Sequence, residues 1–249
     1  MKKLVYLLLL VFVATPIFAE SSLEDADNAY MQEHYQEAAE IYEAALNEGT
    51  NVDVYYNLGN TYYRLKDMGK AILYYERALR LAPDNEDIKY NLELCQSKIV
   101  DQFNKPSEMF FITWLKDFTS SKNSNQWGYI GIVCILFSVI LFGIYRFSSR
   151  VGVRKFSFFV SLGLFLISIL VNFAAAWTYY QYSHDSRAVI MSEVSLYKAS
   201  NDKEEPIRAL NAGTTVNVLQ ENSKGWWEVT LPSGKKGWIE EGSAIKIKE

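Results

Sequence analysis

Two long uncharged stretches, residues 128–145 and 156–183, constrain this chain more than any other feature of its sequence. The first contains 18 residues and the second 28, and 18 residues span about 27 Å as an α-helix. Aromatic residues flank the first stretch and crowd the end of the second, as they do at membrane–water interfaces. A buried core helix is the alternative reading, but two such stretches close together favour a membrane hairpin. We therefore predict transmembrane helices at residues 127–146 and 156–183.

The predicted loop between these helices, residues 147–155, contains no acidic residue. The basic residues in and beside it are Arg146, Arg150, Arg154 and Lys155. Loops rich in Lys and Arg stay on the cytoplasmic side of a membrane. We therefore expect two spans in a bacterial inner membrane, with the portions before and after the hairpin in the periplasm.

The N-terminus independently predicts export. Lys2 and Lys3 precede an uncharged apolar run, and a small residue, Ala19, follows it, which is the order of a secretory signal peptide. We expect residues 1–19 to be removed, with an uncleaved signal anchor as the alternative. Either form places the following segment on the side that the hairpin topology requires.

The sequence contains no motif for catalysis, for a metal or for a cofactor. It has no phosphate-binding loop, no dinucleotide glycine motif and no Gly-x-Ser-x-Gly elbow. Cys95 and Cys134 are not expected to pair, because the second lies inside an apolar stretch, and His34 and His184 are too few for a zinc site. We predict a protein that is not an enzyme, although a site assembled in space can escape motif reading.

Residues 20–101 carry apolar and aromatic residues at helical spacing, and they contain an internal repeat. The stretch beginning at Ala26 aligns with the stretch beginning at Gly59, an offset of 33 residues. Residues 52–85 resemble a tetratricopeptide repeat, a helix–turn–helix unit of about this length. The matching signature positions are Tyr55, Leu58, Gly59, Tyr62, Ala71, Tyr75, Ala78 and Pro83. The unit before them is divergent, and the segment after them resembles a closing helix.

Gly59 needs a physical reason, because Gly inside a helix costs about 1 kcal/mol relative to Ala. The resemblance implies that the two helices of the repeat pack so closely at this position that only a small side chain fits. Ala26 is the equivalent residue of the first unit, and Ala71 and Ala78 are small residues on the opposing helix. We expect the contact between the helices to offset the local cost.

Arrays of such repeats present a concave groove, lined by the first helix of each repeat, that suits a peptide ligand. By analogy with the family, the candidate groove residues are Tyr56, Asn60, Tyr63, Arg64, Tyr90 and Asn91. The alternative is that these residues only pack or solvate the surface. Residues 20–100 contain 16 acidic and 7 basic side chains, a net charge of −9, so we expect no nucleic-acid partner.

Residues 102–126 are predicted to form an amphipathic connector between the repeats and the hairpin. Two interpretations remain open: an amphipathic helix lying on the membrane surface, or a segment packed under the repeats. About three repeats are usually needed for a stable array. This short array is therefore expected to dock against a partner or against the membrane segment.

The apolar period changes to two after residue 186, so residues 184–249 are predicted to form a small closed barrel of short strands. This portion resembles the bacterial SH3-like domain. The matching positions are Gly213, Trp226, Trp227, Gly237 and Trp238. The resemblance implies either binding of cell-wall peptides or a role in assembly alone, and we expect one of Trp226 and Trp227 to lie in the core.

The predicted fold is thus multidomain: an all-α tetratricopeptide repeat domain, a two-helix transmembrane hairpin and a small all-β SH3-like barrel. This order of parts resembles the BatE-type proteins of the Bacteroides aerotolerance (Bat) operons. The resemblance implies a membrane scaffold for stress tolerance that works beside von Willebrand A-type membrane proteins and, indirectly, a MoxR-type ATPase. The alternatives are a peptidoglycan-binding envelope sensor and an envelope-assembly factor that binds no ligand.

Overall fold

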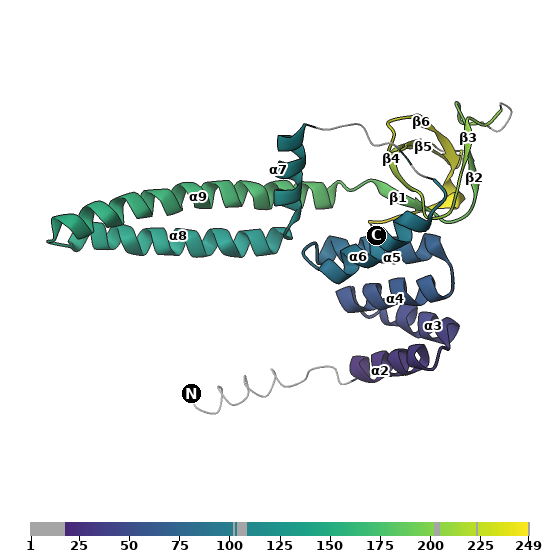
Figure 1. Cartoon of the computed structure of the whole chain (residues 1–249), viewed down its shortest axis with the longest axis horizontal. Helices are drawn as coiled ribbons and strands as arrows, with labels where there is room; N and C mark the ends of the chain where they lie inside the picture. Colours follow the sequence, from purple (N-terminus) through teal and green to yellow (C-terminus); the bar gives the residue numbers. More distant parts are fainter. Residues whose placement is uncertain (1–17, 102, 104–108, 202–204, 223, 249) are drawn as a thin grey trace.

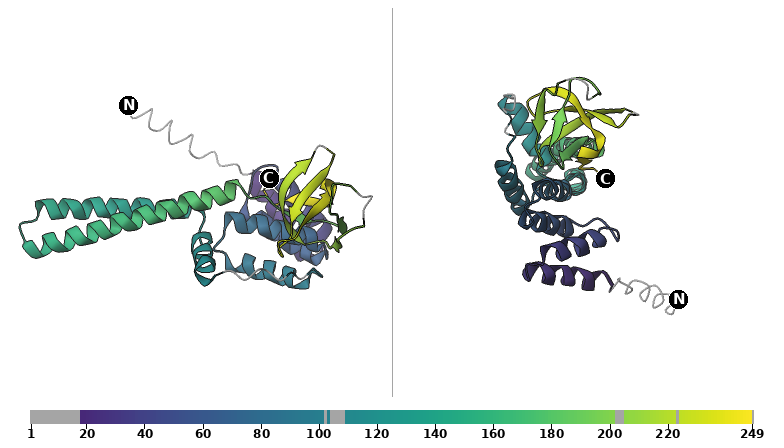
Figure 2. Two further views of the ribbon diagram at one scale, coloured as in Figure 1. Left: turned by 90° about the horizontal axis from the view of Figure 1, so that it is seen from above. Right: turned by 90° about the vertical axis from the view of Figure 1, so that its right-hand side faces the viewer.

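The computed structural model describes residues 18–101, 103, 109–201, 205–222 and 224–248. The chain forms a stack of helices, a long two-helix hairpin and a small β-barrel, which confirms the predicted fold class (Figure 1). The hairpin extends away from the other parts, whereas the barrel lies against the helical stack (Figures 1 and 2). Of the predicted signal peptide, only Phe18 and Ala19 are among the described residues, and they begin the first described helix.

The helical stack is built from antiparallel helix pairs. Its described helices are α2 (Phe18–Met31), α3 (Tyr35–Ala45), α4 (Val52–Arg64), α5 (Met68–Leu81) and α6 (Glu86–Lys98). Asn51, Asp67 and Asn85 begin three of them, because their side-chain oxygens accept hydrogen bonds from N–H groups of the first turn. Glu33 and Lys66 occupy the turns within the two pairs with positive φ of 62° and 64°. They are 33 positions apart, so both repeats turn in the same way.

Gly59 lies in α4 directly against the ring of Tyr75 on α5. A Cβ atom added to Gly59 would come within 2.5 Å of two ring carbons of Tyr75, far closer than van der Waals contact. Ala71 and Ala78 on the same opposing helix are fully buried. The close approach of α4 and α5 that the sequence predicted is therefore present, and the Tyr75 ring is the group that leaves no room for a side chain at position 59.

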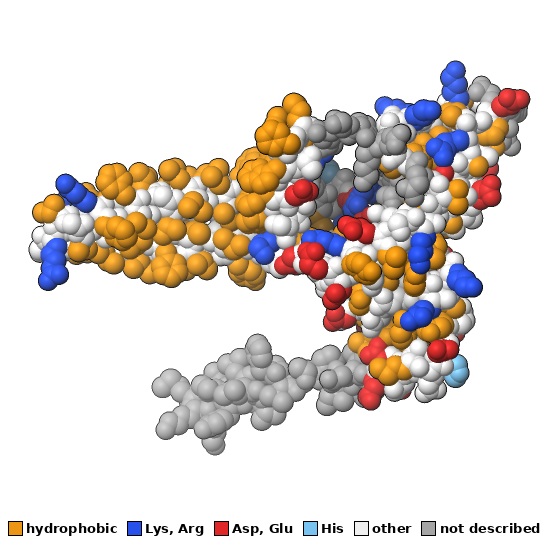
Figure 3. Space-filling view, in the orientation of Figure 1, with side chains coloured by type: hydrophobic (Ala, Val, Ile, Leu, Met, Phe, Trp, Pro, Cys, Tyr) orange, Lys and Arg blue, Asp and Glu red, His pale blue; other side chains and the backbone are white. Residues whose placement is uncertain are grey.

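The hairpin consists of α8 (Ser124–Phe147) and α9 (Val151–Ser183). Ser138 and Ser161 join the two helices, since each hydroxyl donates to the other residue's carbonyl at 2.9 Å. Ser168 likewise donates to the Gly131 carbonyl at 3.2 Å. Most of both apolar surfaces is exposed, and Figure 3 shows hydrophobic side chains covering the hairpin. These helices are long and apolar enough to cross a membrane, and a buried core helix would not expose so much apolar surface.

The connection between α8 and α9 is shorter than the loop predicted at residues 147–155. Because α9 begins at Val151, Arg154 and Lys155 lie near its start, and only residues 148–150 separate the helices. Arg146 lies in the last turn of α8. The predicted bounds of the loop are corrected accordingly: Arg150 lies in the connection, whereas Arg154 and Lys155 belong to α9. The side chains of Arg and Lys are long enough to place their charged groups in water even when the residue lies in the last turn of a helix. A membrane helix can therefore continue through such residues.

The described part of the connector contains α7 (Phe110–Ser120), which runs across the hairpin axis at the open end (Figure 1). The carbonyl of Thr119 accepts hydrogen bonds from both helices, from Trp127 Nε1 and from Thr178 Oγ1, each at 3.1 Å. The large apolar side chains of α7 nevertheless remain exposed: Phe110, Phe111, Trp114, Leu115 and Phe118. Of the two interpretations of the connector, this geometry favours the helix on the membrane surface. Residues 124–126, predicted as connector, already belong to α8.

The C-terminal part is an antiparallel barrel. Its strands are β1 (Arg187–Ile190), β2 (Val194–Leu196), β3 (Arg208–Leu210), β4 (Thr215–Asn222), β5 (Trp226–Thr230), β6 (Lys236–Glu240) and β7 (Ala244–Lys246). One sheet has the order β6-β5-β4-β1-β7, and β2 and β3 form the other. Reciprocal backbone hydrogen bonds between Tyr197 and Trp238 join the second sheet to β6. The sheets thereby enclose a core that includes Ile190, Leu210 and Ile239.

The barrel shares apolar contacts with the helical stack. Val189 of β1 and Ile247, which follows β7, belong to the hydrophobic core of the helices and not to that of the barrel. Gly213 lies at the same contact with a φ of +90°, and a Cβ there would be 2.7 Å from Ile99 Cγ2 and 2.9 Å from Ile72 Cδ1. The barrel is therefore the docking partner that the short array requires.

An ion-pair network borders this apolar contact. Arg187 of β1 contacts Glu76 of α5 at 2.7 Å and Asp185 at 3.0 Å. Arg80 Nε, also from α5, lies 3.6 Å from Asp185 Oδ2. Burial alone would raise the pKa of Asp185, but the hydrogen bonds and charge of Arg187 outweigh burial and lower it. Asp185 thus stays ionised between two arginines from the two parts.

Asp101 forms a second polar link between the same parts. Its Oδ1 accepts a hydrogen bond from Arg208 Nη2 at 2.7 Å, and its Oδ2 accepts from Asn211 N–H at 2.6 Å and from the Thr214 hydroxyl at 2.8 Å. The side chain is only 2% exposed. Burial alone would raise the pKa of Asp101, but these hydrogen bonds and the Arg208 charge lower it below its ordinary value.

We predict that Gly59→Leu destabilises the helical stack by about 3 kcal/mol, because the new side chain would displace the Tyr75 ring from a packed core. Thermal unfolding of the full chain in detergent, followed by circular dichroism, measures the loss. Gly143→Leu on α8 is the control, since nothing lies within 4 Å of a Cβ added there. Native-like unfolding of Gly59→Leu would refute the packing described for α4 and α5.

We predict that Asp101→Asn lowers the free energy of unfolding at pH 7 by about 1–3 kcal/mol, because buried donors lose a charged acceptor. The lowered pKa of Asp101 sets the pH dependence. Its contribution is complete above the unfolded pKa of about 3.9 and is lost as the pH falls through the lower folded pKa. Thermal unfolding between pH 3 and 8 should therefore show the two proteins converging in acid. Equal stability at pH 7 would contradict this role.

Candidate binding groove

A cavity of about 260 Å³ lies on the face of the helical stack formed by α2, α4 and α6. The first helices of successive pairs meet there, as the repeat architecture dictates. The lining residues are Tyr30, Asn60, Tyr63, Arg64, Tyr75, Asn91, Leu94 and Cys95. They come from four helices, so the shape of the cavity depends on the packing of the whole stack.

Four of the six residues predicted for the groove, Asn60, Tyr63, Arg64 and Asn91, line this cavity. Tyr56 is adjacent, because its hydroxyl oxygen accepts a hydrogen bond from Asn91 Nδ2 at 3.1 Å.

Tyr90, also predicted for the groove, lies one helical turn before Leu94 on the same side of α6. Tyr90 is 67% exposed and does not line the cavity. Ile88, Leu92 and Cys95 set the buried face of α6, and at 3.6 residues per turn position 90 points away from that face.

Asn60 and Asn91 form a small hydrogen-bond network across α4 and α6. Asn60 Oδ1 accepts from the Tyr75 hydroxyl at 2.7 Å and from Asn91 Nδ2 at 3.2 Å. Within the described residues, Asn60 Nδ2 and Asn91 Oδ1 have no hydrogen-bond partner. The network thus orients one unused donor and one unused acceptor, the pair that a peptide carbonyl and a peptide N–H require.

The charged groups of the groove are cationic. A hydrogen bond to the Tyr30 hydroxyl, together with nearby negative charge, raises the pKa of Arg64 above its ordinary value. Lys98 donates to the Tyr63 hydroxyl and lies 4.6 Å from the centroid of the Tyr63 ring. No described residue that lines the cavity is acidic. The groove therefore has the opposite sign to the helical portion as a whole, whose net charge is −9.

Sequence reasoning missed four lining residues: Tyr30, Leu94 and Cys95, and also Tyr75, which was assigned to the packing signature alone. The signal for Tyr30 was available, since it aligns with Tyr63 at the offset of 33 residues. Cys95 takes no part in thiolate chemistry at neutral pH, because burial raises the pKa of its thiol to about 11. Leu94 and Cys95 lie on α6. The described helices contain no second copy of this closing helix, so an alignment of repeats could not indicate which of its residues face the groove.

The signature residues of the barrel take structural positions. Trp227 is 5% exposed and belongs to the barrel core, whereas Trp226 and Trp238 are half-buried. Trp226 contacts Tyr197 edge-on, with ring centroids 5.6 Å apart. A Cβ on Gly237 would come within 2.6 Å of Leu196, so β2 and β6 approach closely only with glycine there.

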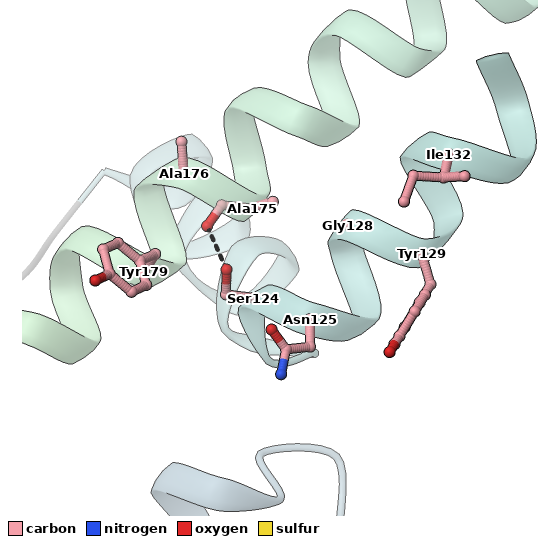
Figure 4. A pocket seen from close by; sticks show the side chains of 8 residues that line it. All are labelled: Ser124, Asn125, Gly128, Tyr129, Ile132, Ala175, Ala176 and Tyr179. Atoms are coloured by element: carbon pink, nitrogen blue, oxygen red, sulfur yellow. Dashed lines mark hydrogen bonds between the residues drawn. The ribbon is translucent and has the colours of Figure 1, made fainter. Parts of the chain in front are cut away.

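A larger hollow of about 460 Å³ lies between α8 and α9 near their ends beside α7 (Figure 4). Across the hollow, the Ser124 hydroxyl of α8 donates a hydrogen bond to the Ala175 carbonyl of α9 at 3.0 Å. Tyr129 and Ile132 of α8 also line the hollow. The lining is mostly apolar and contains no charged residue among those described. Such a surface suits an apolar chain such as that of a lipid.

Among the described residues, neither histidine belongs to a group of side chains that could hold a metal ion. His34 lies 3.6 Å from Glu37 on the surface, and His184 stacks on Tyr180 with centroids 4.2 Å apart. Across the described residues, no group of three His, Cys, Asp or Glu side chains could hold a metal ion.

Two family models match parts of the chain. The tetratricopeptide repeat model matches residues 52–85, and the bacterial SH3 domain model matches residues 192–244. No curated protein matches the chain. The chain is thus similar to tetratricopeptide repeats over α4 and α5 and to bacterial SH3 domains over the barrel, and both similarities indicate protein–protein interaction.

Proposed function

We propose that this protein is a non-enzymatic scaffold of a bacterial inner membrane whose helical groove binds an extended, acidic peptide segment of a partner protein. One observation carries the proposal: Asn60 and Asn91 present an unused donor and an unused acceptor beside the Arg64 guanidinium. A main chain supplies the complementary carbonyl and N–H, and a carboxylate supplies the complement to Arg64.

The membrane orientation is part of this proposal. Arg146, Arg150, Arg154 and Lys155 gather at the closed end of the hairpin, where Figure 3 shows basic side chains. By the positive-inside rule this end faces the cytoplasm, so the groove and the barrel face the periplasm. The exposed apolar side chains of α7, which runs across the hairpin, fit the outer surface of the same membrane.

The resemblance to the Bat family supports a more specific setting. In that setting the groove partner is a von Willebrand A-type membrane protein, and a MoxR-type ATPase acts on the complex from the cytoplasm in stress tolerance. The support for this assignment is the order of the helical repeats, the two-helix hairpin and the SH3-like barrel along the chain, which resembles that of the Bat family proteins.

A second candidate function is binding of peptidoglycan by the barrel. The half-buried Trp226, packed edge-on against Tyr197, favours it because aromatic rings can stack on a wall fragment. A pulldown with purified peptidoglycan tests it, and absence of binding at low salt would count against it. The full chain in detergent is required, because Val189 and Ile247 pack into the helical core and an isolated barrel would expose them.

We predict that p-benzoylphenylalanine at position 94 crosslinks an acidic segment of a partner in intact cells. Leu94 lines the cavity, whereas Glu93 is exposed on the same helix and does not line it. The same probe at position 93 is therefore the matched control. Mass spectrometry identifies the crosslinked segment, and recovery of von Willebrand A-type proteins would support the Bat setting. Equal crosslinking from both positions would contradict the groove.

Arg64→Ala should weaken this interaction about fivefold, the value of one exposed ion pair. Asn60→Ala should weaken it as well, because the peptide carbonyl loses its donor. Lys89→Ala is the control, since Lys89 pairs with Glu86 at 2.8 Å on the surface, outside the cavity. The yield of the crosslink from position 94 measures the effect. An unchanged yield in both groove variants would show that a different surface binds the partner.

A further inference from the structure

A second hollow lies between α8 and α9, nearer the closed end of the hairpin than the hollow beside α7. Its volume is about 340 Å³. Its lining residues are Ser138, Val139, Phe142, Phe158, Ser161, Leu162 and Phe165. No described residue that lines either hollow is charged. We call the hollow beside α7 the open-end hollow and this one the closed-end hollow.

The two hollows lie on the same side of the hairpin. On α9 their lining residues include Phe158, Leu162, Phe165, Ala176 and Tyr179. On α8 they include Gly128, Ile132, Val139 and Phe142. Within each set the intervals are three positions, four positions or sums of these, so each set follows one face of its helix. Both hollows therefore belong to one groove between the helices, which we call the hairpin groove.

Asn172 of α9 shares this face, since it lies four positions before Ala176. Its side chain is exposed, and its Nδ2 donates to the Ser168 carbonyl at 2.8 Å. The carboxamide lies over Gly131 of α8, because a Cβ added there would be 2.5 Å from Asn172 Nδ2. Among the described residues, no group donates a hydrogen bond to Asn172 Oδ1. The hairpin groove thus contains an unused acceptor beside its open-end hollow.

This acceptor lies inside the hydrocarbon core when the hairpin spans the bilayer. A core of about 30 Å corresponds to about 20 residues of helix. Lys155 is the last charged residue before the apolar part of α9, and 20 further residues end at Ala175, two positions before the interfacial Trp177. Asn172 therefore lies about one turn inside the core. No water is available there to satisfy its oxygen, and an unpaired polar group in lipid is costly.

We propose that the hairpin groove binds a single transmembrane helix of another membrane protein, whose hydroxyl or amide side chain donates a hydrogen bond to Asn172 Oδ1. Side chains of this kind join helices within membranes. Lipid chains fill apolar hollows but supply no donor to Asn172. The proposal rests on the membrane placement of the hairpin in the proposed function, and it does not depend on the groove of the helical stack.

A second copy of this chain fits the hairpin groove less well than a single helix does. Two copies in one membrane share the same orientation, so a closed dimer has its two-fold axis along the membrane normal. Each hollow would then face its own counterpart at the same depth, and neither would be filled. A single helix lying along the groove fills both hollows with its own side chains, as a helix does in a groove between two others.

The spacing of the hollows specifies this helix further. Gly128 and Val139, which line the open-end and the closed-end hollow, are 11 positions apart on α8, or about 17 Å. The partner helix should therefore carry two large apolar side chains about 11 positions apart, which share one face after three turns. Nothing lies within 4 Å of a Cβ added to Gly128. Contacts within the hairpin do not require this glycine, whereas an approaching helix benefits from the open space.

Photocrosslinking in intact cells tests this proposal. p-Benzoylphenylalanine replaces Val139, which lines the closed-end hollow and is 65% exposed, or Phe137, which is 57% exposed and lines neither hollow. Two positions differ by about 200° around a helix, so the control faces the other side of α8 at nearly the same depth. We expect position 139 to crosslink a membrane-spanning segment of another protein. Mass spectrometry should find a hydroxyl or amide side chain about eight positions from the crosslinked residue, because Gly131, beside Asn172, is eight positions from Val139.

Asn172→Leu should lower the crosslink yield from position 139 about threefold, because the hydrogen bond between the helices is lost. The hydrogen bonds of Asn172 stay within α9, so this change leaves those between α8 and α9 intact. Leu170→Ala is the matched control. Leu170 is 69% exposed, lies two positions from Asn172 and lines neither hollow.

The outcomes separate the occupants. A phospholipid adduct alone, or a covalent dimer of this chain, would overturn the proposal, as would equal yields from positions 137 and 139 or an unchanged yield in Asn172→Leu. The crosslink from position 94 is measured independently, so the groove of the helical stack stands or falls separately. Labelling of Phe137→Cys by a membrane-impermeant maleimide in membrane vesicles would overturn the membrane placement and both proposals. A mapped adduct with the expected donor, reduced in Asn172→Leu and preserved in Leu170→Ala, would support the proposal.

Discussion

The contact between the barrel and α5 is the interaction on which the rest of the structure depends. A two-repeat array leaves the apolar face of its last full repeat uncovered, and about three repeats are usually needed to bury enough surface. Val189 and Ile247 supply the missing apolar contact from the barrel, and Gly213 permits the close approach. The array therefore reaches a stable size by incorporating residues that follow the membrane hairpin in the chain.

Two buried carboxylates make this docking specific as well as favourable. Asp101 accepts hydrogen bonds from three barrel residues, and Asp185 lies between Arg187 and Arg80. Any other register of the barrel on α5 would leave Asp101 buried without these donors, which costs several kcal/mol, whereas Asp185 would keep its hydrogen bonds from Arg187 and lose only Arg80. The docking holds the barrel on the helical stack while the groove on α2, α4 and α6 stays open to a partner.

Periodic features of the sequence were enough to predict the hairpin, the repeat and four of the groove residues. Gly59 was informative because glycine destabilises a helix, so its presence predicted a close contact that excludes a larger side chain. The Tyr75 ring makes that contact. Tyr90 shares one side of α6 with Leu94 but lies a turn earlier, outside the cavity, and helical periodicity does not indicate where along a helix a cavity ends. The barrel docking left no sequence signal, since Arg187 and Glu76 are separated by 111 positions and no periodicity links them. Contacts of this kind are determined by tertiary packing alone.

The position of Ile247 in the chain has a consequence for biosynthesis. Its side chain completes the core beside α5, yet it is made long after α5 ends at Leu81. At roughly 5–20 residues per second, the interval between the two is on the order of 10–30 s. During that time the whole hairpin is made while this face of α5 lacks its contact with Ile247. The completion of this core is therefore tied to the rate at which the C-terminal part is made, and slow synthesis would prolong the exposure of the apolar face of α5.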